Sequence, residues 1–114
     1  MSAGRRRVVV TGLGLATPIG MGADAYWEAL LDRRCGLRRI ASFDPGGMPS
    51  PYGGELPEFT FSDCFPKAYR KSVKVMARDI VIAVAAAYQA VKDAGLVTRC
   101  IVDRGESPGP VNVD

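Results

Sequence analysis

The chain has 114 residues, of which 47% are hydrophobic and 24% are charged, so its composition excludes a disordered chain and favours a globular one. The formal net charge of +3 does not demand a nucleic-acid partner, and no aromatic residues alternate with the basic ones as a base-stacking surface requires. The sequence contains no histidine, which excludes any Cys–His or Ser–His–Asp mechanism confined to these residues.

The first predicted element is a β-strand from Arg6 to Thr11. Three β-branched valines follow one another in it, and the Gly12-Leu13-Gly14 segment closes it. Because the apolar run is continuous rather than alternating, we expect this strand to be buried on both faces. A turn is predicted at Thr17-Pro-Ile-Gly20.

A helix is predicted from Ala25 to Arg33, with Asp24 as its N-cap and an end near Gly36. Its apolar positions have helical spacing and are expected to face the core: Trp27, Leu30 and Leu31.

The segment from 41 to 66 is rich in proline and glycine and is predicted to be irregular. A long helix is then predicted from Lys67 to Ala94, with Gly95 at its C′ position. Its core stripe is expected to comprise Val73, Met76, Ala77, Ile80, Val84, Ala87 and Val91. Short strands are predicted at Cys100–Val102 and from Val111.

A doubly buried strand and a helix that is apolar almost all round, from Ile80 to Val91, both require covering partners that the sequence does not supply. We therefore expect the chain to be an incomplete part of a larger domain. The most apolar run, Ile80 to Tyr88, is too short to cross a bilayer, which takes about 20 residues, so no membrane span is expected.

The order of several short motifs resembles the N-terminal region of β-ketoacyl-[acyl-carrier-protein] synthases, especially the type II elongation condensing enzymes. The resemblance covers roughly residues 5 to 97 and leaves 97–114 as a poorly matched tail. The matching segments are Arg7 to Gly20, Trp27-Glu-Ala-Leu-Leu31, Cys35-Gly-Leu37, Phe43-Asp44, Gly54-Glu55, Phe59 and Asp93-Ala-Gly-Leu96.

The resemblance implies an α/β, thiolase-like fold with α-β-α-β-α layers, of which residues 1–114 would form only the beginning of the first half. That beginning would comprise one strand, the first helix, a long loop and a long buried helix.

The activity implied by the resemblance is an acyltransferase that condenses an acyl thioester with malonyl-carrier protein, in fatty-acid or polyketide synthesis. In the family, a cysteine at a helix N-terminus takes the acyl group and two histidines assist decarboxylation. All three lie beyond the position that matches Asp114, so we expect no catalytic residue here and no activity of the chain alone. The resemblance also implies a homodimer that needs no metal or bound organic cofactor, because the acyl groups arrive on carrier-protein phosphopantetheine. A cytoplasmic location is expected from the three cysteines, whose spacings match no disulfide pattern.

Three further features admit a functional interpretation. Cys35, Cys64 and Cys100 have spacings that match neither a zinc site nor a disulfide pattern, and without an imidazole none is expected to be catalytic. A dinucleotide-binding loop at Gly12 would need glycine where Thr17 stands, so we expect close backbone packing there instead. A stripe of basic residues opens the long predicted helix and is either a solvated face or a docking site for the acidic carrier protein: Lys67, Arg70, Lys71, Lys74 and Arg78.

Two hypotheses besides the condensing enzyme follow. One is a non-catalytic interaction module, either a truncated homologue or a partner subunit, that binds carrier protein or a synthase. The other is a nucleotide-binding domain, which the broken glycine motif disfavours.

Overall fold

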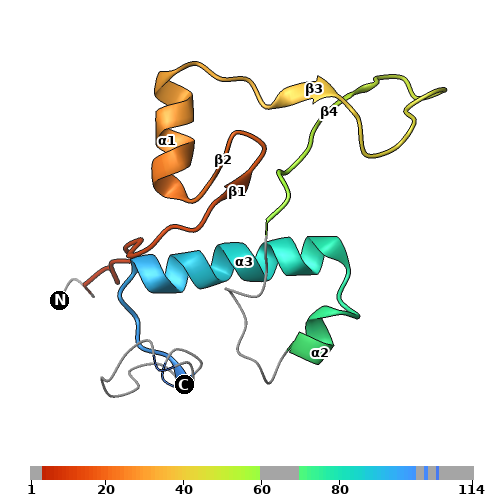
Figure 1. Ribbon diagram of the computed structural model, residues 1–114. Helices are drawn as coiled ribbons and strands as arrows, with labels where there is room; N and C mark the ends of the chain where they lie inside the picture. The colour runs from red at the N-terminus through yellow and green to blue at the C-terminus, as the bar shows by residue number, and fades with distance from the viewer. Residues whose placement is uncertain (1–3, 60–69, 100–101, 103–104, 106–114) are drawn as a thin grey trace.

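The computed structural model describes residues 4–59, 70–99, 102 and 105 (Figure 1). In chain order the elements are β1 (Ala16–Thr17), β2 (Gly20–Met21), α1 (Ala23–Leu31), β3 (Leu37–Arg39), β4 (Tyr52–Gly54), α2 (Arg70–Val73) and α3 (Arg78–Asp93). The strands form two separate antiparallel hairpins. α1 and the β1–β2 hairpin lie on one side of α3. The β3–β4 hairpin with its connecting loop projects away from α1, at the upper right of Figure 1.

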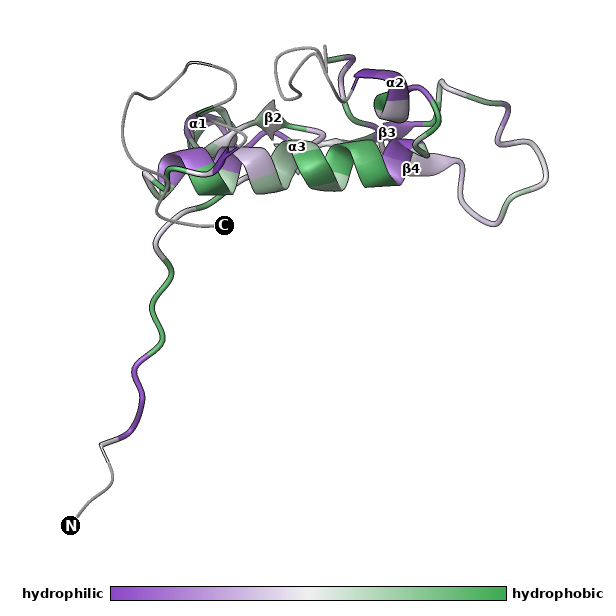
Figure 2. Cartoon of the chain, turned by 90° about the horizontal axis from the view of Figure 1, so that it is seen from below, coloured by the Kyte–Doolittle hydropathy of each residue, from purple (hydrophilic) through white to green (hydrophobic). Residues whose placement is uncertain are grey.

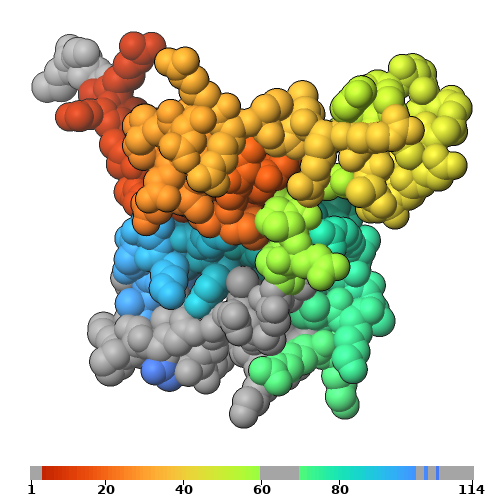
Figure 3. All heavy atoms as spheres, turned by 45° about the horizontal axis from the view of Figure 1, so that its top comes forward, coloured from red at the N-terminus to blue at the C-terminus, as the bar shows by residue number. Residues whose placement is uncertain are grey.

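The fold is open. Its radius of gyration is 18.2 Å, whereas a compact domain of 100 residues has about 13 Å. The buried apolar side chains of the described residues are few and small, with exposed fractions of 0% for Ala29, 5% for Val81 and 1% for Ala85. The space-filling view shows the segment around the β3–β4 loop standing out from the rest of the molecule (Figure 3). Apart from Pro45 in the loop between β3 and β4, the buried residues of the described chain therefore lie on α1 and α3.

The expected strand from Arg6 to Thr11 is not a strand in the structure. Residues 4–15 have no assigned secondary structure, and Val8 and Val10 are 93% and 80% exposed. Figure 2 shows this N-terminal segment running away from the body of the molecule. A strand needs a neighbour for its main-chain groups, and among the described residues no strand pairs with residues 6–11.

The predicted turn at Thr17 is confirmed as the β1–β2 hairpin, in which Thr17 pairs with Gly20 and Ala16 with Met21. The Thr17 hydroxyl stabilises it twice, because Oγ1 lies 2.8 Å from the Gly20 carbonyl oxygen and accepts from the Gly20 N–H at 3.1 Å. Gly22 then begins α1 with a φ of 90°, a value that favours glycine. Asp24 lies in the first turn and not at the N-cap, so that prediction was wrong.

α1 ends at Leu31, before the end expected near Gly36. The Arg34 N–H donates to the Ala29 carbonyl at 2.9 Å and the Arg33 N–H to Leu30 at 3.0 Å. These two bonds form a Schellman motif, and Arg33 takes its left-handed position with a φ of 54°. The expected core stripe was also wrong, since Trp27 and Leu31 are 61% and 65% exposed while Ala29 faces inward.

The segment predicted to be irregular contains β4, which pairs with β3 so that Leu37 faces Gly54 and Arg39 faces Tyr52. This strand pair could not be predicted from the sequence, because the β4 residues Tyr-Gly-Gly lack the alternation of apolar and polar residues that indicates a strand. Residues 60–66 lie outside the described part.

The single long helix is two helices in the structure. α2 ends at Val73, and Ala77, with a ψ of 153°, is extended and separates it from α3. Gly95 is the left-handed C′ residue as predicted, with a φ of 67°, and the Leu96 N–H bonds to the Val91 carbonyl at 3.2 Å. Lys67 lies outside the described residues.

The buried face of α3 also differs from the predicted stripe. Ile80 is 48% exposed, whereas Val81 and Ala85 are buried, so the inward face is rotated by one position. The strand predicted at Cys100–Val102 is wrong at its last residue, because the Val102 N–H donates to Thr98 in a helical turn. Cys100 and the strand expected from Val111 lie outside the described residues.

Candidate functional site

The basic residues form the first candidate site. Arg70 and Lys71 lie on α2, Lys74 lies in the break, and Arg78 is the first residue of α3. All four are exposed, and neither ion pair among the described residues involves them. The helix break means that the four do not form one straight stripe, but no acidic residue occurs from 70 to 78. This cluster, hereafter the basic cluster, is a positively charged surface at one end of α3 (Figure 1).

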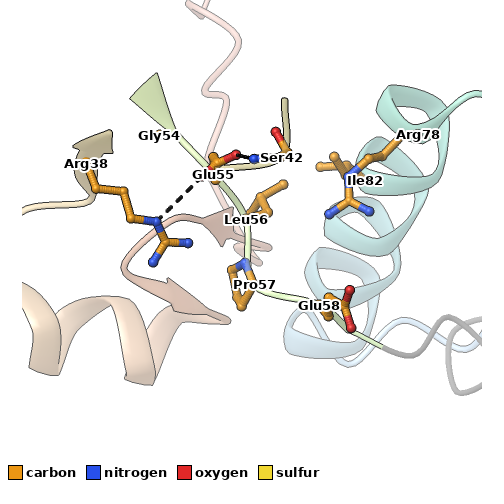
Figure 4. A pocket seen from close by; sticks show the side chains of 9 residues that line it. All are labelled: Arg38, Ser42, Gly54, Glu55, Leu56, Pro57, Glu58, Arg78 and Ile82. Atoms are coloured by element: carbon orange, nitrogen blue, oxygen red, sulfur yellow. Dashed lines mark hydrogen bonds and ion pairs between the residues drawn. The ribbon is translucent and has the colours of Figure 1, made fainter. Parts of the chain in front are cut away.

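An open groove of about 610 Å³ lies beside the basic cluster. Arg78 and Ile82 of α3 form one wall, and the segment from Gly54 to Glu58 forms the other (Figure 4). Arg38 and Ser42 complete the lining. The groove thus presents two guanidinium groups and two carboxylates beside the apolar side chains of Leu56, Pro57 and Ile82, and it is an open surface rather than an enclosed catalytic cavity.

Glu55 organises the β3–β4 side of this groove. Its two carboxylate oxygens accept hydrogen bonds from the Ala41 and Ser42 N–H groups at 3.0 Å and 2.9 Å. Arg38 Nε lies 3.8 Å from Glu55 Oε2 (Figure 4). The Ser42 side chain, followed by these N–H donors and by Arg38, lowers the pKa of Glu55 below its ordinary value. The carboxylate is therefore held ionised and fixes the loop between the strands.

The glycine segment at 12–14 packs against α3 and does not form a phosphate-binding loop. A β-carbon at Gly12 would lie 2.6 Å from the Ala94 nitrogen, and one at Gly14 would lie 2.7 Å from the Ala90 nitrogen. Only glycine permits so close an approach of two backbones. The close packing expected from the sequence is confirmed.

Two side chains of α3 bind the main chain of the same segment. The Leu13 N–H donates to Asp93 Oδ2 at 2.8 Å, and the Leu15 N–H donates to Gln89 Oε1 at 3.2 Å. Four residues of a helix rise about 6.0 Å, which nearly matches the roughly 6.6 Å that two extended residues span. Every second N–H group of the extended segment can therefore reach a side chain one helical turn further along α3. These donors are occupied within the chain, which further disfavours nucleotide binding. We call this contact the N-terminal junction.

Sequence reasoning overlooked Gln89 and Asp93 as structural residues. The available signal was the polarity of Gln89 inside an otherwise apolar helical run and the position of Asp93 one turn later. Sequence reasoning likewise gave no role to Glu55, because its partners are backbone groups that composition does not reveal.

The cysteines form no site in the described part of the chain. Cys35 is exposed and free, and Cys64 and Cys100 lie outside the described residues. Among the residues that the structure describes, no group of acidic or cysteine side chains is arranged to hold a metal ion. The described helices include none long and apolar enough to cross a membrane.

Solved structures place this arrangement among known folds. The chain superposes on the ishigamide ketosynthase/chain length factor with a TM-score of 0.65 and 37% identity, over 83% of this chain and 24% of that one. The class of protein is therefore that of ketosynthases, and the chain forms part of their α/β fold.

The sequence comparisons define the family. Residues 5–107 match the model of the β-ketoacyl synthase N-terminal domain. The chain is 42% identical over 93 residues to 3-oxoacyl-[acyl-carrier-protein] synthase 2 of Synechocystis sp., a match that covers 82% of this chain and 22% of that protein. It is 39% identical over 89 residues to the tetracenomycin polyketide synthase ketoacyl synthase beta subunit of Streptomyces glaucescens, covering 78% of this chain and 21% of that protein. The chain belongs to the β-ketoacyl synthase family, and it spans about a fifth of the length of these relatives.

Proposed function

We propose that this chain supplies the N-terminal part of a β-ketoacyl-[acyl-carrier-protein] synthase with the thiolase-like α-β-α-β-α architecture. The protein would catalyse decarboxylative condensation of an acyl thioester with malonyl-carrier protein, in fatty-acid or polyketide synthesis. The observation that carries this proposal is the continuous match of residues 5–107 to the family's N-terminal domain. The names of the relatives support both pathways.

The chain by itself is proposed to be inactive. It has no histidine, which is the usual base that activates a cysteine nucleophile, and Cys35, the cysteine within the described residues, is exposed and free. Its contribution is therefore to folding and to recognition of the carrier. The reaction is proposed to need no metal and no bound organic cofactor, because the substrates arrive attached to phosphopantetheine. A homodimer is proposed from the same resemblance, and a cytoplasmic location from the three cysteines, whose spacings match no disulfide pattern.

The basic cluster is proposed to dock the acidic carrier protein, through Arg70, Lys71 and Lys74 and, from the sequence, Lys67. Support comes from the exposure of the described members and from the absence of any ion pair to them among the described residues. Such a surface accelerates association and orients the carrier without taking part in chemistry.

A chimera tests the proposed activity. The aligned 93 residues of the Synechocystis synthase are replaced by those of this chain. The chimera is expected to form 3-oxoacyl-carrier protein from acyl- and malonyl-carrier protein, as measured by intact-protein mass spectrometry. The unmodified Synechocystis enzyme is the positive control. A chimera that folds and binds carrier protein but makes no product would contradict the proposal.

The chain alone provides the second arm of this test. Incubated with acyl-carrier protein, it is expected to acquire no stable acyl group on Cys35, Cys64 or Cys100. Acylation of any of them would show that the chain carries its own nucleophile, against the proposed division of labour.

A non-catalytic partner subunit is the second candidate. It is favoured by relatives whose names describe a beta subunit and a ketosynthase/chain length factor. This candidate predicts an inactive chimera together with stable co-purification of the chain with a ketosynthase subunit, so the same experiment separates the two.

A further inference from the structure

The β3–β4 unit, defined as residues 37–55, makes its hydrogen bonds within itself. β3 and β4 pair along their whole length. Beyond the strands, the Ile40 N–H donates to the Pro51 carbonyl oxygen at 2.9 Å, and the Met48 N–H donates to Pro45 at 3.1 Å. Within the described residues, the hydrogen bonds of the unit join its own residues to one another. The unit therefore does not need a distant segment to satisfy these groups.

Glu55 ties the residues that follow β3 to the end of β4. Its two carboxylate oxygens accept from consecutive N–H groups, those of Ala41 and Ser42. The Glu55 side chain is 18% exposed and that of its ion-pair partner Arg38 is 62% exposed. Because water screens an exposed ion pair, the two hydrogen bonds are expected to contribute more than the pair does. Loss of this one side chain would leave two main-chain donors without their acceptor.

The base of the unit contacts the rest of the molecule at Pro18, in the turn between β1 and β2. A β-carbon at Gly36 would lie 2.8 Å from Pro18 Cβ, and one at Gly54 would lie 2.8 Å from Pro18 Cγ. The Pro18 ring thus lies against the backbone of two glycines. Such a contact buries little apolar area and stabilises little. The loop end of the unit stands out from the molecule (Figure 3).

A segment with its own hydrogen bonds and little packing on its neighbours has the properties of a local unfolding unit. We propose that the β3–β4 unit opens and closes as a whole, with the Glu55 carboxylate holding it closed, while α1 and α3 remain folded. Arg38, Ser42 and Glu55 line the groove beside α3 (Figure 4), so opening of the unit displaces part of one wall of that groove. The proposal rests on contacts made within the chain and does not depend on the proposed function.

Amide hydrogen exchange in Glu55→Ala tests this device. The Ala41 and Ser42 amides lose a charged acceptor, and their exchange is expected to accelerate about tenfold. The Ile40 amide is expected to accelerate by the same factor, although its acceptor is the Pro51 carbonyl, because the unit opens as a whole. Amides of α3 are expected to exchange at the parent rate.

Glu58→Ala is the matched control. Glu58 is the other carboxylate of the groove lining and is exposed, so its removal is expected to leave exchange in the unit unchanged. In Glu55→Ala, acceleration confined to Ala41 and Ser42 would reveal two local bonds rather than the closure of a unit, and would overturn the proposal. Equal acceleration in α3 would also overturn it, because the unit would then not open separately from the helices.

The same measurement in the chimera with the Synechocystis synthase tests whether the rest of the domain holds the unit instead. The exchanged region contains the unit, and peptides from residues 37–55 report on it by mass spectrometry. Glu55→Ala is expected to accelerate their exchange about tenfold, with peptides from α3 unchanged. Glu55→Gln keeps one acceptor oxygen and is expected to give an intermediate rate. Unchanged exchange in the Glu55→Ala chimera would show that other parts of the synthase hold the unit closed, and would rule the proposal out.

Discussion

Asp93 Oδ2 lies 2.8 Å from the backbone nitrogen of Leu13, a residue 80 positions earlier in the chain. With the bond from Leu15 to Gln89, it fixes where the N-terminal segment crosses α3. Beside these bonds, Gly12 and Gly14 lie against Ala86, Ala90 and Ala94, and contacts between such small residues bury little apolar area and stabilise little. These two hydrogen bonds therefore carry much of the specificity of the N-terminal junction.

Replacing Asp93 by alanine is expected to lower the free energy of unfolding by about 1 kcal/mol, because the Leu13 N–H loses its charged acceptor. Amide hydrogen exchange at Leu13 is expected to accelerate roughly fivefold, the equivalent of that energy. Asp93→Asn retains an acceptor oxygen and is expected to change both quantities less. Unchanged exchange at Leu13 in Asp93→Ala would show that the bond does not hold the segment.

Gly14→Ala is expected to destabilise the fold by about 1–3 kcal/mol, because the new β-carbon overlaps the Ala86 carbonyl oxygen and the backbones must separate. Gly4→Ala is the matched control, since nothing lies within 4 Å of the point that its new β-carbon would occupy. Urea denaturation of both variants measures the difference. Equal stabilities would mean that the close approach at residue 14 contributes nothing.

Arg33→Gly is expected to stabilise the chain by about 0.5–1 kcal/mol, because Arg33 occupies a left-handed conformation that glycine adopts without strain. Gly95→Ala is expected to have the opposite effect, since Gly95 occupies the equivalent position at the end of α3 with a φ of 67°. Thermal unfolding of the two variants tests the pair. A fall in stability for Arg33→Gly would indicate that its side chain makes a contribution larger than the strain.

Glu55 is expected to make stability depend on acid pH. Its pKa is lowered in the folded chain, so its contribution is fully present above the unfolded-state pKa of about 4.3 and is lost as the pH falls through the folded-state value. Melting temperatures of the parent and of Glu55→Gln, compared from neutral to acid pH, are expected to differ by a constant amount above that pH and to converge below it. A difference independent of pH would assign the effect to packing.

Charge reversal in the basic cluster tests carrier docking. Lys71→Glu with Lys74→Glu is expected to weaken binding of acyl-carrier protein about tenfold at low salt, and less at high salt, as for exposed charge pairs. The control reverses the same number of charges near the N-terminus, at Arg5 and Arg6. Equal weakening in both double variants, measured by isothermal titration calorimetry, would point to net charge alone.

The local elements that follow from backbone chemistry were predictable from the sequence. The Thr17 turn and the end of α3 at Gly95 were predicted because Pro-Ile-Gly and a helix-terminal glycine have few alternative conformations. Arg33 was not, because an arginine in a left-handed conformation has no sequence signature.

The elements that depend on distant neighbours were less predictable. The Val8–Val10 run reads as a buried strand, but burial requires a sheet that the described residues do not form. The buried face of α3 was misplaced by one residue, because apolar residues surround the helix and their spacing alone does not single out the face of Val81 and Ala85.

The candidate sites show the same division. The basic cluster could be located from the sequence, since exposed charge needs no partner to be visible. The break between α2 and α3 was missed because no proline or glycine marks it. The groove beside it was also missed, because its walls come from segments at least twenty positions apart.

The alanines at 86, 90 and 94 recur once per helical turn, so the surface of α3 repeats itself along its axis. Sliding the N-terminal segment by one repeat would preserve two polar contacts, yet it would bring the β-carbon of Val10 or of Ala16 against the helix backbone. The register between the N-terminal segment and α3 is thus set by the glycines at 12 and 14, which have no β-carbon. A methyl group added at residue 12 or 14 would therefore leave the N-terminal segment no position along α3 at which it could pack closely.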